Sequence, residues 1–202
     1  MKKVLIVVGI IGLIALCWYF FTSTPIKNYP PKGDTIVAFG DSLVQGVGAT
    51  EGNDFVSVLS RQIGKPIKNS GKSGDTTATA LARVGEVLAH DPDIVLVLLG
   101  GNDYLRRVPQ ETTFANLQQI VATLQAKGAL VVVLGVRGGL LHDSREAKFA
   151  QLAKEMQAAY VPNVMAGLFG NERYMSDAIH PNDLGYQAIA DKVLPVVRGV
   201  LE

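Results

Sequence analysis

Residues 35–43 read Thr35-Ile36-Val37-Ala38-Phe39-Gly40-Asp41-Ser42-Leu43. The first five form a short, mainly apolar run that lacks the polar alternation of a half-exposed strand. This pattern predicts a strand buried on both faces. The strand leads into a turn of Gly, Asp and Ser. Because a serine at the end of a buried strand can act as a nucleophile, Ser42 is the first candidate for a functional residue.

Similar runs rich in Val, Ile and Leu recur at 93–99 and 130–136, with weaker ones near 66–69 and 161–165. Between the runs, apolar residues recur at helical spacing. These stripes are Phe55, Leu59 and Ile63; Leu81, Val84 and Leu88; Phe114, Leu117, Val121 and Leu124; and Phe149, Leu152 and Met156. Five β-then-α units predict an α/β fold, with a mainly parallel five-stranded sheet and helices on both faces.

Residues that commonly begin or end helices occur at the ends of the predicted helices. Gly64 and Gly128 fall just after two of the predicted helices, as residues that end helices do. Asp143 and Glu146 have the spacing of a capping box at the start of another. A final helix is predicted from about Asn182, and Pro195 is expected to end or kink it.

Three polar or glycine positions follow predicted strands. They are Ser42, Gly74 and Asn102. In open parallel sheets, ligands bind beyond the carboxyl ends of the strands, where the strand order reverses. We therefore expect these three residues to meet at one rim of the sheet.

Residues 1–21 differ from the rest of the chain. Lys2 and Lys3 precede an unbroken apolar run of 18 residues from Val4 to Phe21, which is close to the length that spans about 30 Å of hydrocarbon. A cleaved signal has a shorter apolar core of roughly 7–15 residues and a clear cleavage site, and 22–24 is a weak candidate for one. We interpret 1–21 as a transmembrane anchor or uncleaved signal, with the following domain periplasmic or extracellular. A secreted protein is the alternative if this segment is cleaved.

The remaining chain divides into a linker and one domain. Residues 22–33 contain three prolines and no apolar periodicity, which predicts an extended linker. Residues 34–202 have the length of a single domain with a sizeable core. They hold 15 basic and 18 acidic residues, and this balance excludes the clustered basic face of a nucleic-acid-binding protein.

Four residues could form a catalytic set with Gly74. A serine hydroxyl needs a base within hydrogen-bond reach and a third group to orient that base. His180 and Asp177, three residues apart before the last helix, can fill these roles for Ser42. The N–H groups of Ser42 and Gly74 and the amide of Asn102 could hold an oxyanion. Each residue alone is ordinary turn, cap or surface composition, but their joint occurrence favours catalysis.

Other motifs fail on their spacing. Gly71-Lys72-Ser73 lacks the first glycine of a phosphate-binding loop, because Pro66 stands at that position. Gly46 and Gly48 lack the third glycine of a dinucleotide fingerprint, because Glu51 replaces it. No metal-binding pattern occurs, so neither a metal nor another cofactor is expected.

Four blocks of this sequence resemble the SGNH or GDSL-type serine esterases and lipases. They are Gly40-Asp41-Ser42-Leu43, Asn69-Ser70-Gly71-Lys72-Ser73-Gly74-Asp75-Thr76, Gly100-Gly101-Asn102-Asp103 and Asp177-Ala178-Ile179-His180-Pro181-Asn182. The resemblance covers essentially 34–202 and is closest to the bacterial arylesterase, thioesterase and lysophospholipase branch. It implies a flavodoxin-like three-layer α/β/α fold, no metal, and hydrolysis of carboxylic esters or thioesters through an acyl-enzyme.

Within that resemblance the substrate is a small-molecule or lipid acyl ester, and the loop from Arg137 to His142 is expected to border the acyl site. The location beside a bilayer favours lysophospholipids or other short and medium acyl esters. A carbohydrate O-acetyl esterase acting on envelope polysaccharide is the enzymatic alternative. A non-catalytic binding module is the alternative from another class, because doubly wound folds host many functions.

Overall fold

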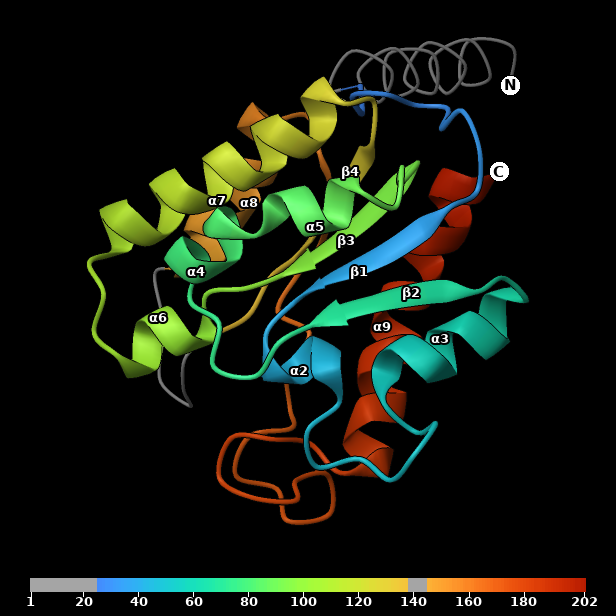
Figure 1. The fold of residues 1–202 in the computed structure, drawn as a ribbon. Helices are drawn as coiled ribbons and strands as arrows, with labels where there is room; N and C mark the ends of the chain where they lie inside the picture. Colours follow the sequence, from blue (N-terminus) through green and yellow to red (C-terminus); the bar gives the residue numbers. More distant parts are fainter. Residues whose placement is uncertain (1–24, 138–144) are drawn as a thin grey trace, which may run out of the picture.

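The computed structural model describes residues 25–137 and 145–202. In these residues a five-stranded parallel sheet forms the centre of an α/β fold (Figure 1), which confirms the predicted fold class. Its strands are β1 (Ile36–Gly40), β2 (Ile67–Gly71), β3 (Ile94–Leu98), β4 (Leu130–Leu134) and β5 (Ala159–Val161). They lie in the order β2-β1-β3-β4-β5, which is the flavodoxin-like order.

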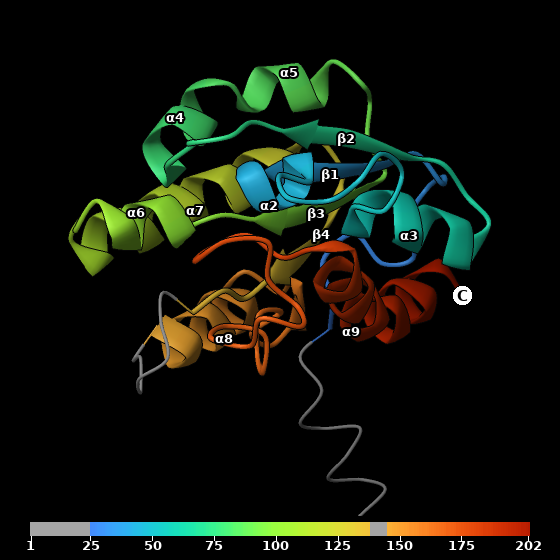
Figure 2. The same cartoon turned by 90° about the horizontal axis from the view of Figure 1, so that it is seen from below.

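Helices cover both faces of the sheet (Figures 1 and 2), giving three layers. The helices are α2 (Ser42–Gln45), α3 (Phe55–Ile63), α4 (Thr77–Ala82), α5 (Val84–Leu88), α6 (Gly101–Leu105), α7 (Gln110–Ala126), α8 (Arg145–Glu155) and α9 (Asp183–Leu201). On one face α3 packs against α9, and on the other α7 packs against α4, α5 and α8.

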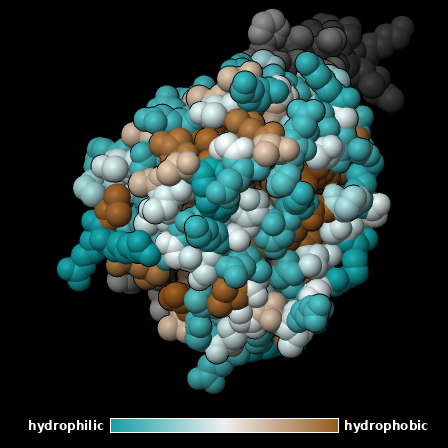
Figure 3. All heavy atoms as spheres, in the orientation of Figure 1, coloured by the Kyte–Doolittle hydropathy of each residue, from teal (hydrophilic) through white to brown (hydrophobic). Residues whose placement is uncertain are grey.

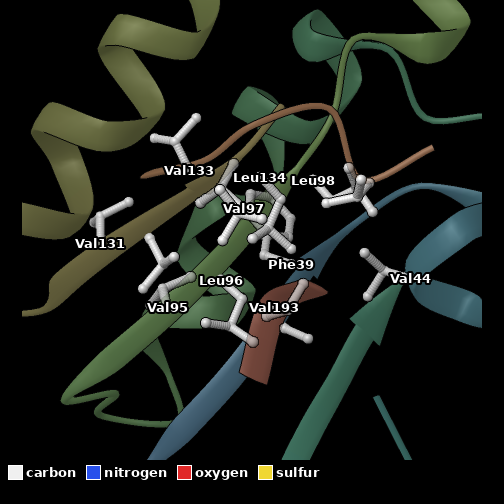
Figure 4. Close-up of a cluster of buried hydrophobic side chains, with 14 of the residues drawn as sticks. Phe39, Val44, Val95, Leu96, Val97, Leu98, Val131, Val133, Leu134 and Val193 are labelled. Carbon is white, nitrogen blue, oxygen red and sulfur yellow. The ribbon is translucent and has the colours of Figure 1, made fainter. Parts of the chain in front are cut away.

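The core lies on both sides of the three central strands. Every residue of β1, β3 and β4 is buried, which explains why their sequences show no polar alternation. Figure 4 shows side chains of these strands, with Val44 and Val193 from the flanking helices, in one contiguous cluster. Each fully buried Val, Leu or Phe contributes about 1.5–3 kcal/mol relative to an exposed one. On the face seen in Figure 3, the remaining apolar side chains are scattered among hydrophilic ones.

Two elements differ from their predicted form. The last strand lies at Ala159–Val161 instead of 161–165, because Val164 and Met165 are buried in a turn after Pro162 and need no strand to reach the core. The helix predicted around Leu81–Leu88 is two short helices separated at Arg83. Apolar spacing alone does not detect either difference.

The final helix also departs from expectation. The helix begins where predicted, and Asn182 caps it by accepting a hydrogen bond from the N–H of Gly185. Of the two expectations for Pro195, that it ends or kinks the helix, the first is wrong, because α9 continues to Leu201. Val197 and Val200 beyond the proline are buried, and their packing offsets the loss of one backbone hydrogen bond. Asp143, the proposed cap of α8, lies outside the described residues.

The segment 25–33 is attached to the domain in the structure. The Asn28 side chain donates to the carbonyls of Gln125 and Ala129 at 2.9 and 2.8 Å. The Lys27 N–H donates to the carbonyl of Gln157 at 2.8 Å. These acceptors lie just before β4 and β5, so the segment contacts the amino-terminal edge of the sheet. Among the described residues, no helix has the length and apolar character needed to cross a bilayer, and the predicted anchor at 1–21 lies outside them.

Candidate active site

The site lies at the carboxyl ends of β1 and β3. β1 pairs with β2 on one side and β3 on the other, so the strand order reverses between β1 and β3. Ser42 follows β1, and Asn102 follows β3. Gly74 follows β2, and its loop is joined to β1 by a hydrogen bond from the Lys72 N–H to the Gly40 carbonyl. The prediction that these residues emerge at one rim is confirmed.

Ser42 is held at the first position of the short helix α2. The side chain of Asp41 caps this helix by accepting a hydrogen bond from the Leu43 N–H at 3.0 Å. Gly40 allows the tight turn from strand to helix, since a Cβ there would overlap the Leu98 carbonyl and the Val44 side chain. Ser42 is 8% exposed, so little more than one edge of its side chain is accessible.

His180 and Asp177 lie on the loop before α9 and face Ser42. The Nε2 atom of His180 lies 3.1 Å from Ser42 Oγ. The other ring nitrogen, Nδ1, lies 2.7 Å from Asp177 Oδ2. Asp177 Oδ1 also accepts the N–H groups of Ile179 and His180, which fixes the carboxylate beside the ring. The three residues thus form a continuous chain from hydroxyl to imidazole to carboxylate.

Hydrogen bonds stabilise the ionised form of the Asp177 carboxylate. The hydrogen bond with the His180 side chain, followed by the two backbone N–H groups, lowers the pKa of Asp177 to about 2. The side chain is 53% exposed, whereas that of His180 is 15% exposed. Asp177 is therefore an ionised acceptor at neutral pH, and water shares in its solvation.

Asn102 is joined by a hydrogen bond to the loop that carries Gly74. Gly74 has a left-handed backbone (φ +82°), which favours glycine. Asn102 Nδ2 donates to the backbone carbonyl of Asp75, the next residue after Gly74, at 3.0 Å. Its remaining N–H has only a long contact, 3.4 Å to Asp41 Oδ2. One amide proton thus fixes Asn102 to the Gly74 loop and the other can serve a ligand.

Asp41 is a buried carboxyl within this site. Burial is the largest effect on it, and the nearby Asp75 and Asp103 carboxylates add to the effect, so the pKa of Asp41 rises to about 7. The Leu43 N–H and His180 act in the opposite direction. Asp41 therefore titrates near neutral pH while it caps the helix of Ser42.

A pocket opens over Ser42 and is walled mainly by apolar side chains. Its apolar lining consists of Leu43, Leu105, Val136, Phe169 and Ile179. The polar lining includes Ser42, Asn102 and His180, and Gly74 does not line the pocket. From the loop expected to border the acyl site, Arg137 lines the pocket, and 138–142 lie outside the described residues. In the described part of the chain, no three Asp, Glu, His or Cys side chains gather as metal ligands.

Sequence patterns did not point to the apolar lining. Leu105 and Ile179 lie within or next to the motif blocks, but are 51% and 39% exposed and carry no periodic signal. Phe169 lies in a turn far from any motif. The one available signal was the position of Leu105 and Ile179, each within three residues of a candidate catalytic residue.

Comparison with known proteins finds one matching family and several similar enzymes. The family model of the GDSL-like Lipase/Acylhydrolase family matches residues 38–188. Thioesterase 1/protease 1/lysophospholipase L1 of Escherichia coli K12 is 32% identical over 167 residues, which cover 78% of this chain and 80% of that protein. Esterase TesA of Pseudomonas aeruginosa is 28% identical, covering 83% of this chain and 89% of TesA.

A solved structure has the same architecture. The psychrotrophic esterase EstA from Pseudoalteromonas sp., in a crystal structure inhibited by monoethylphosphonate, superposes with a TM-score of 0.74 at 26% sequence identity. The match covers 84% of this chain and 99% of EstA. The alignment therefore extends over nearly the whole of that esterase.

Proposed function

Because this chain belongs to the GDSL-like lipase/acylhydrolase family, we propose that it is a serine hydrolase that cleaves carboxylic esters or thioesters through an acyl-enzyme. The observation that carries the proposal is the chain of contacts from Ser42 to His180 to Asp177, at 3.1 and 2.7 Å. Both distances are within the reach that proton transfer and imidazole orientation require.

In the first half of the reaction, Ser42 Oγ attacks the acyl carbonyl carbon. Nε2 of His180 takes the hydroxyl proton as the new C–O bond forms. The imidazolium is stabilised by Asp177, whose low pKa keeps it ionised. His180 then gives the proton to the leaving oxygen or sulfur. Its departure leaves the acyl group on Ser42.

The negative charge of the tetrahedral intermediate needs fixed donors. At the first position of α2, the N–H of Ser42 has no acceptor within its own helix. The Gly74 N–H and the second N–H of Asn102 complete the set that we assign. Water then attacks the acyl-enzyme, with His180 as base again, and releases the acid and free Ser42.

The apolar wall of the pocket supports an acyl group as the portion that enters it. Leu105, Phe169 and Ile179 offer contact to hydrocarbon rather than hydrogen bonds to sugar hydroxyls. We infer from this that short to medium acyl esters, lysophospholipids among them, suit the site better than O-acetylated polysaccharide.

The test is hydrolysis of p-nitrophenyl esters from acetyl to palmitoyl by the purified full-length chain, with Ser42→Ala as the blank. Acyl-CoA thioesters and an O-acetylated glycan are assayed in parallel. Turnover that depends on Ser42 and extends beyond acetyl supports the proposal. Activity confined to acetyl groups on glycan would assign the carbohydrate esterase instead, and folded protein without any Ser42-dependent turnover would favour a binding module.

We also propose that residues 1–21 anchor the protein in a membrane, with the catalytic domain periplasmic or extracellular. The apolar run from Val4 to Phe21 behind two lysines supports this location. Alkaline carbonate extraction of membranes from the producing cell should leave the full chain in the pellet. Recovery in the medium of a chain that begins after residue 21 would show secretion instead.

A further inference from the structure

Arg83 is a buried cation at the junction of α4 and α5. Its side chain is 9% exposed and forms a salt bridge with Asp75, from Nε to Oδ2 at 2.6 Å. Nη2 donates to two backbone carbonyls, those of Gly40 and Ser70, each at 3.0 Å. The guanidinium also lies over the ring of Phe39, 4.7 Å from its centre.

The acceptors of Nε and Nη2 of Arg83 all lie on segments that carry residues we assign to the oxyanion hole. The remaining nitrogen, Nη1, lies 3.7 Å from the exposed carboxylate of Glu86. Gly40 precedes Ser42 by two residues at the end of β1. Ser70 is the next-to-last residue of β2, the strand that leads into the loop of Gly74. Asp75 follows Gly74 directly, and its backbone carbonyl accepts the hydrogen bond from Asn102. One guanidinium is thus tied directly to the segments of Ser42 and Gly74, and through Asp75 to Asn102.

We infer that Arg83 is a positioning residue for the oxyanion hole, an inference that rests on the proposed function. Three donors from three strand ends must converge on one oxygen, and preorganised donors stabilise it most. The planar fork of arginine can serve the Asp75 carboxylate and two carbonyls together, whereas the single ammonium of lysine cannot keep that geometry. A salt bridge serving stability alone would not need to reach the carbonyls at the ends of β1 and β2.

A second arginine supports the same loop from the solvent side. Arg106 donates from Nη2 to the carbonyl of Gly74 at 2.9 Å. Gly74 is thereby held through its own carbonyl on one side and through Asp75 on the other. Arg106 is exposed, so Arg83 is the inner and better shielded of the two supports.

The experiment compares Arg83→Lys with the wild-type full-length chain on the p-nitrophenyl ester that it turns over fastest. We expect kcat to fall by about 10- to 100-fold, because a small displacement of catalytic groups has an effect of that size. KM should stay within about twofold, and the pH profile should keep its shape, because His180 and Asp177 are not displaced. Arg198→Lys is the matched control, since Arg198 also donates to a backbone carbonyl, that of Gln62 on the surface.

A double-mutant cycle separates positioning from a structural role. If Arg83 acts through the oxyanion hole, adding Arg83→Lys to Asn102→Ala should lower kcat much less than it does in the wild type. The rate of Ser42 phosphonylation by a p-nitrophenyl phosphonate should fall in parallel with kcat. Wild-type kcat in Arg83→Lys, or losses that multiply fully in the double variant, would overturn the inference.

Folding is checked by circular dichroism and urea unfolding. If Arg83→Lys does not fold, Asp75→Asn takes its place under the same criteria, because it removes the charge from the salt bridge and keeps the side-chain shape. The Ser42→Ala blank keeps two failures apart. An active wild type with an unaffected Arg83→Lys rejects the positioning role, whereas a wild type without Ser42-dependent turnover rejects the proposed function.

Discussion

Nε2 of His180 lies 3.1 Å from Oγ of Ser42, although 138 residues separate them in the chain. Hydrogen bonds beside the site join the segment that follows Ser42 to the segment that follows His180. Tyr186 at the start of α9 donates to the carbonyl of Val47 at 2.7 Å. Asp183 accepts both the N–H and the hydroxyl of Thr50, at 2.8 and 2.6 Å. The distance between the two side chains is therefore set by these hydrogen bonds as well as by the sheet.

Removal of either end of this pair should abolish nearly all turnover. Ser42→Ala and His180→Ala should each lower kcat by about 10⁴- to 10⁶-fold, since nucleophile and base act as a unit. Steady-state kinetics on p-nitrophenyl esters measure this. For the same reason the double variant should be no slower than the worse single one. A multiplied loss in the double variant would mean that the two residues act independently.

The amide of Asn102 is expected to act in the transition state. Asn102→Ala should lower kcat by about 10²- to 10³-fold with little change in KM, the effect of losing one oxyanion donor. The measurement is kcat and KM on the same ester, with thermal unfolding as a control for the lost hydrogen bond to Asp75. A variant with normal kcat would show that Asn102 only supports the loop.

Asp177 should matter through its charge. Asp177→Asn keeps the shape but cannot stabilise the imidazolium, so kcat should fall by about 10²- to 10⁴-fold. Because hydrogen bonds hold the pKa of Asp177 at about 2, its ionisation should produce no limb in the pH–rate profile above pH 4. Asp191→Asn, on the exposed side of α9, is the control and should retain wild-type kcat. Equal rates for the two variants would contradict the assigned role.

Asp41 should make stability depend on pH. Burial raises the pKa of Asp41 to about 7, whereas in the unfolded chain the pKa is close to the ordinary aspartate value of 3.8. Between these values the folded state binds more protons, so the free energy of unfolding should fall as pH rises from about 4 to about 7. The fall attributable to Asp41 is of the order of 4 kcal/mol. Above pH 7 both states are ionised and the contribution is constant.

Urea unfolding at several pH values from 4 to 8 measures this for the wild type and for Asp41→Asn. The substituted side chain stays neutral and can still accept from the Leu43 N–H. The difference in unfolding free energy between the two proteins should therefore grow in favour of the variant as pH rises through the window. Parallel curves would mean that Asp41 is already ionised in the folded state at pH 4.

Much of the fold follows from the local sequence, and the exceptions have physical causes. β1, β3 and β4 could be predicted because central parallel strands must be apolar throughout. β2 gave a weak signal because it is an edge strand with Lys68 and Asn69 exposed. The last strand was misplaced because buried apolar residues in a turn resemble a strand in sequence. Pro195 does not end α9, because the burial of Val197 and Val200 beyond it stabilises the continued helix.

The candidate site could be assembled from the sequence because its members stand in compact motifs that follow strands. The contacts that hold these residues in place could not be predicted from the sequence. Arg83 donates to the backbone carbonyl of Gly40, 43 residues earlier in the chain, and the sequence around Arg83 contains no pattern that indicates this contact. The burial of Asp41, and with it the raised pKa, also depends on residues distant in the chain, such as Asn102, whose amide lies 3.4 Å from the Asp41 carboxylate. Long-range arrangement of polar groups is what the sequence alone did not reveal.

The attachment of Asn28 to the carbonyls before β4 has a practical consequence. A recombinant chain that starts at residue 34 lacks the Asn28 hydrogen bonds at the amino-terminal edge of the sheet, so the expressed chain should begin at or before Pro25. The same attachment gives the molecule a polarity. A segment joined ahead of Pro25 would therefore meet the domain at the amino-terminal edge of the sheet. Ser42 lies at the opposite, carboxyl-terminal edge, so the length of the strands sets its distance from that segment.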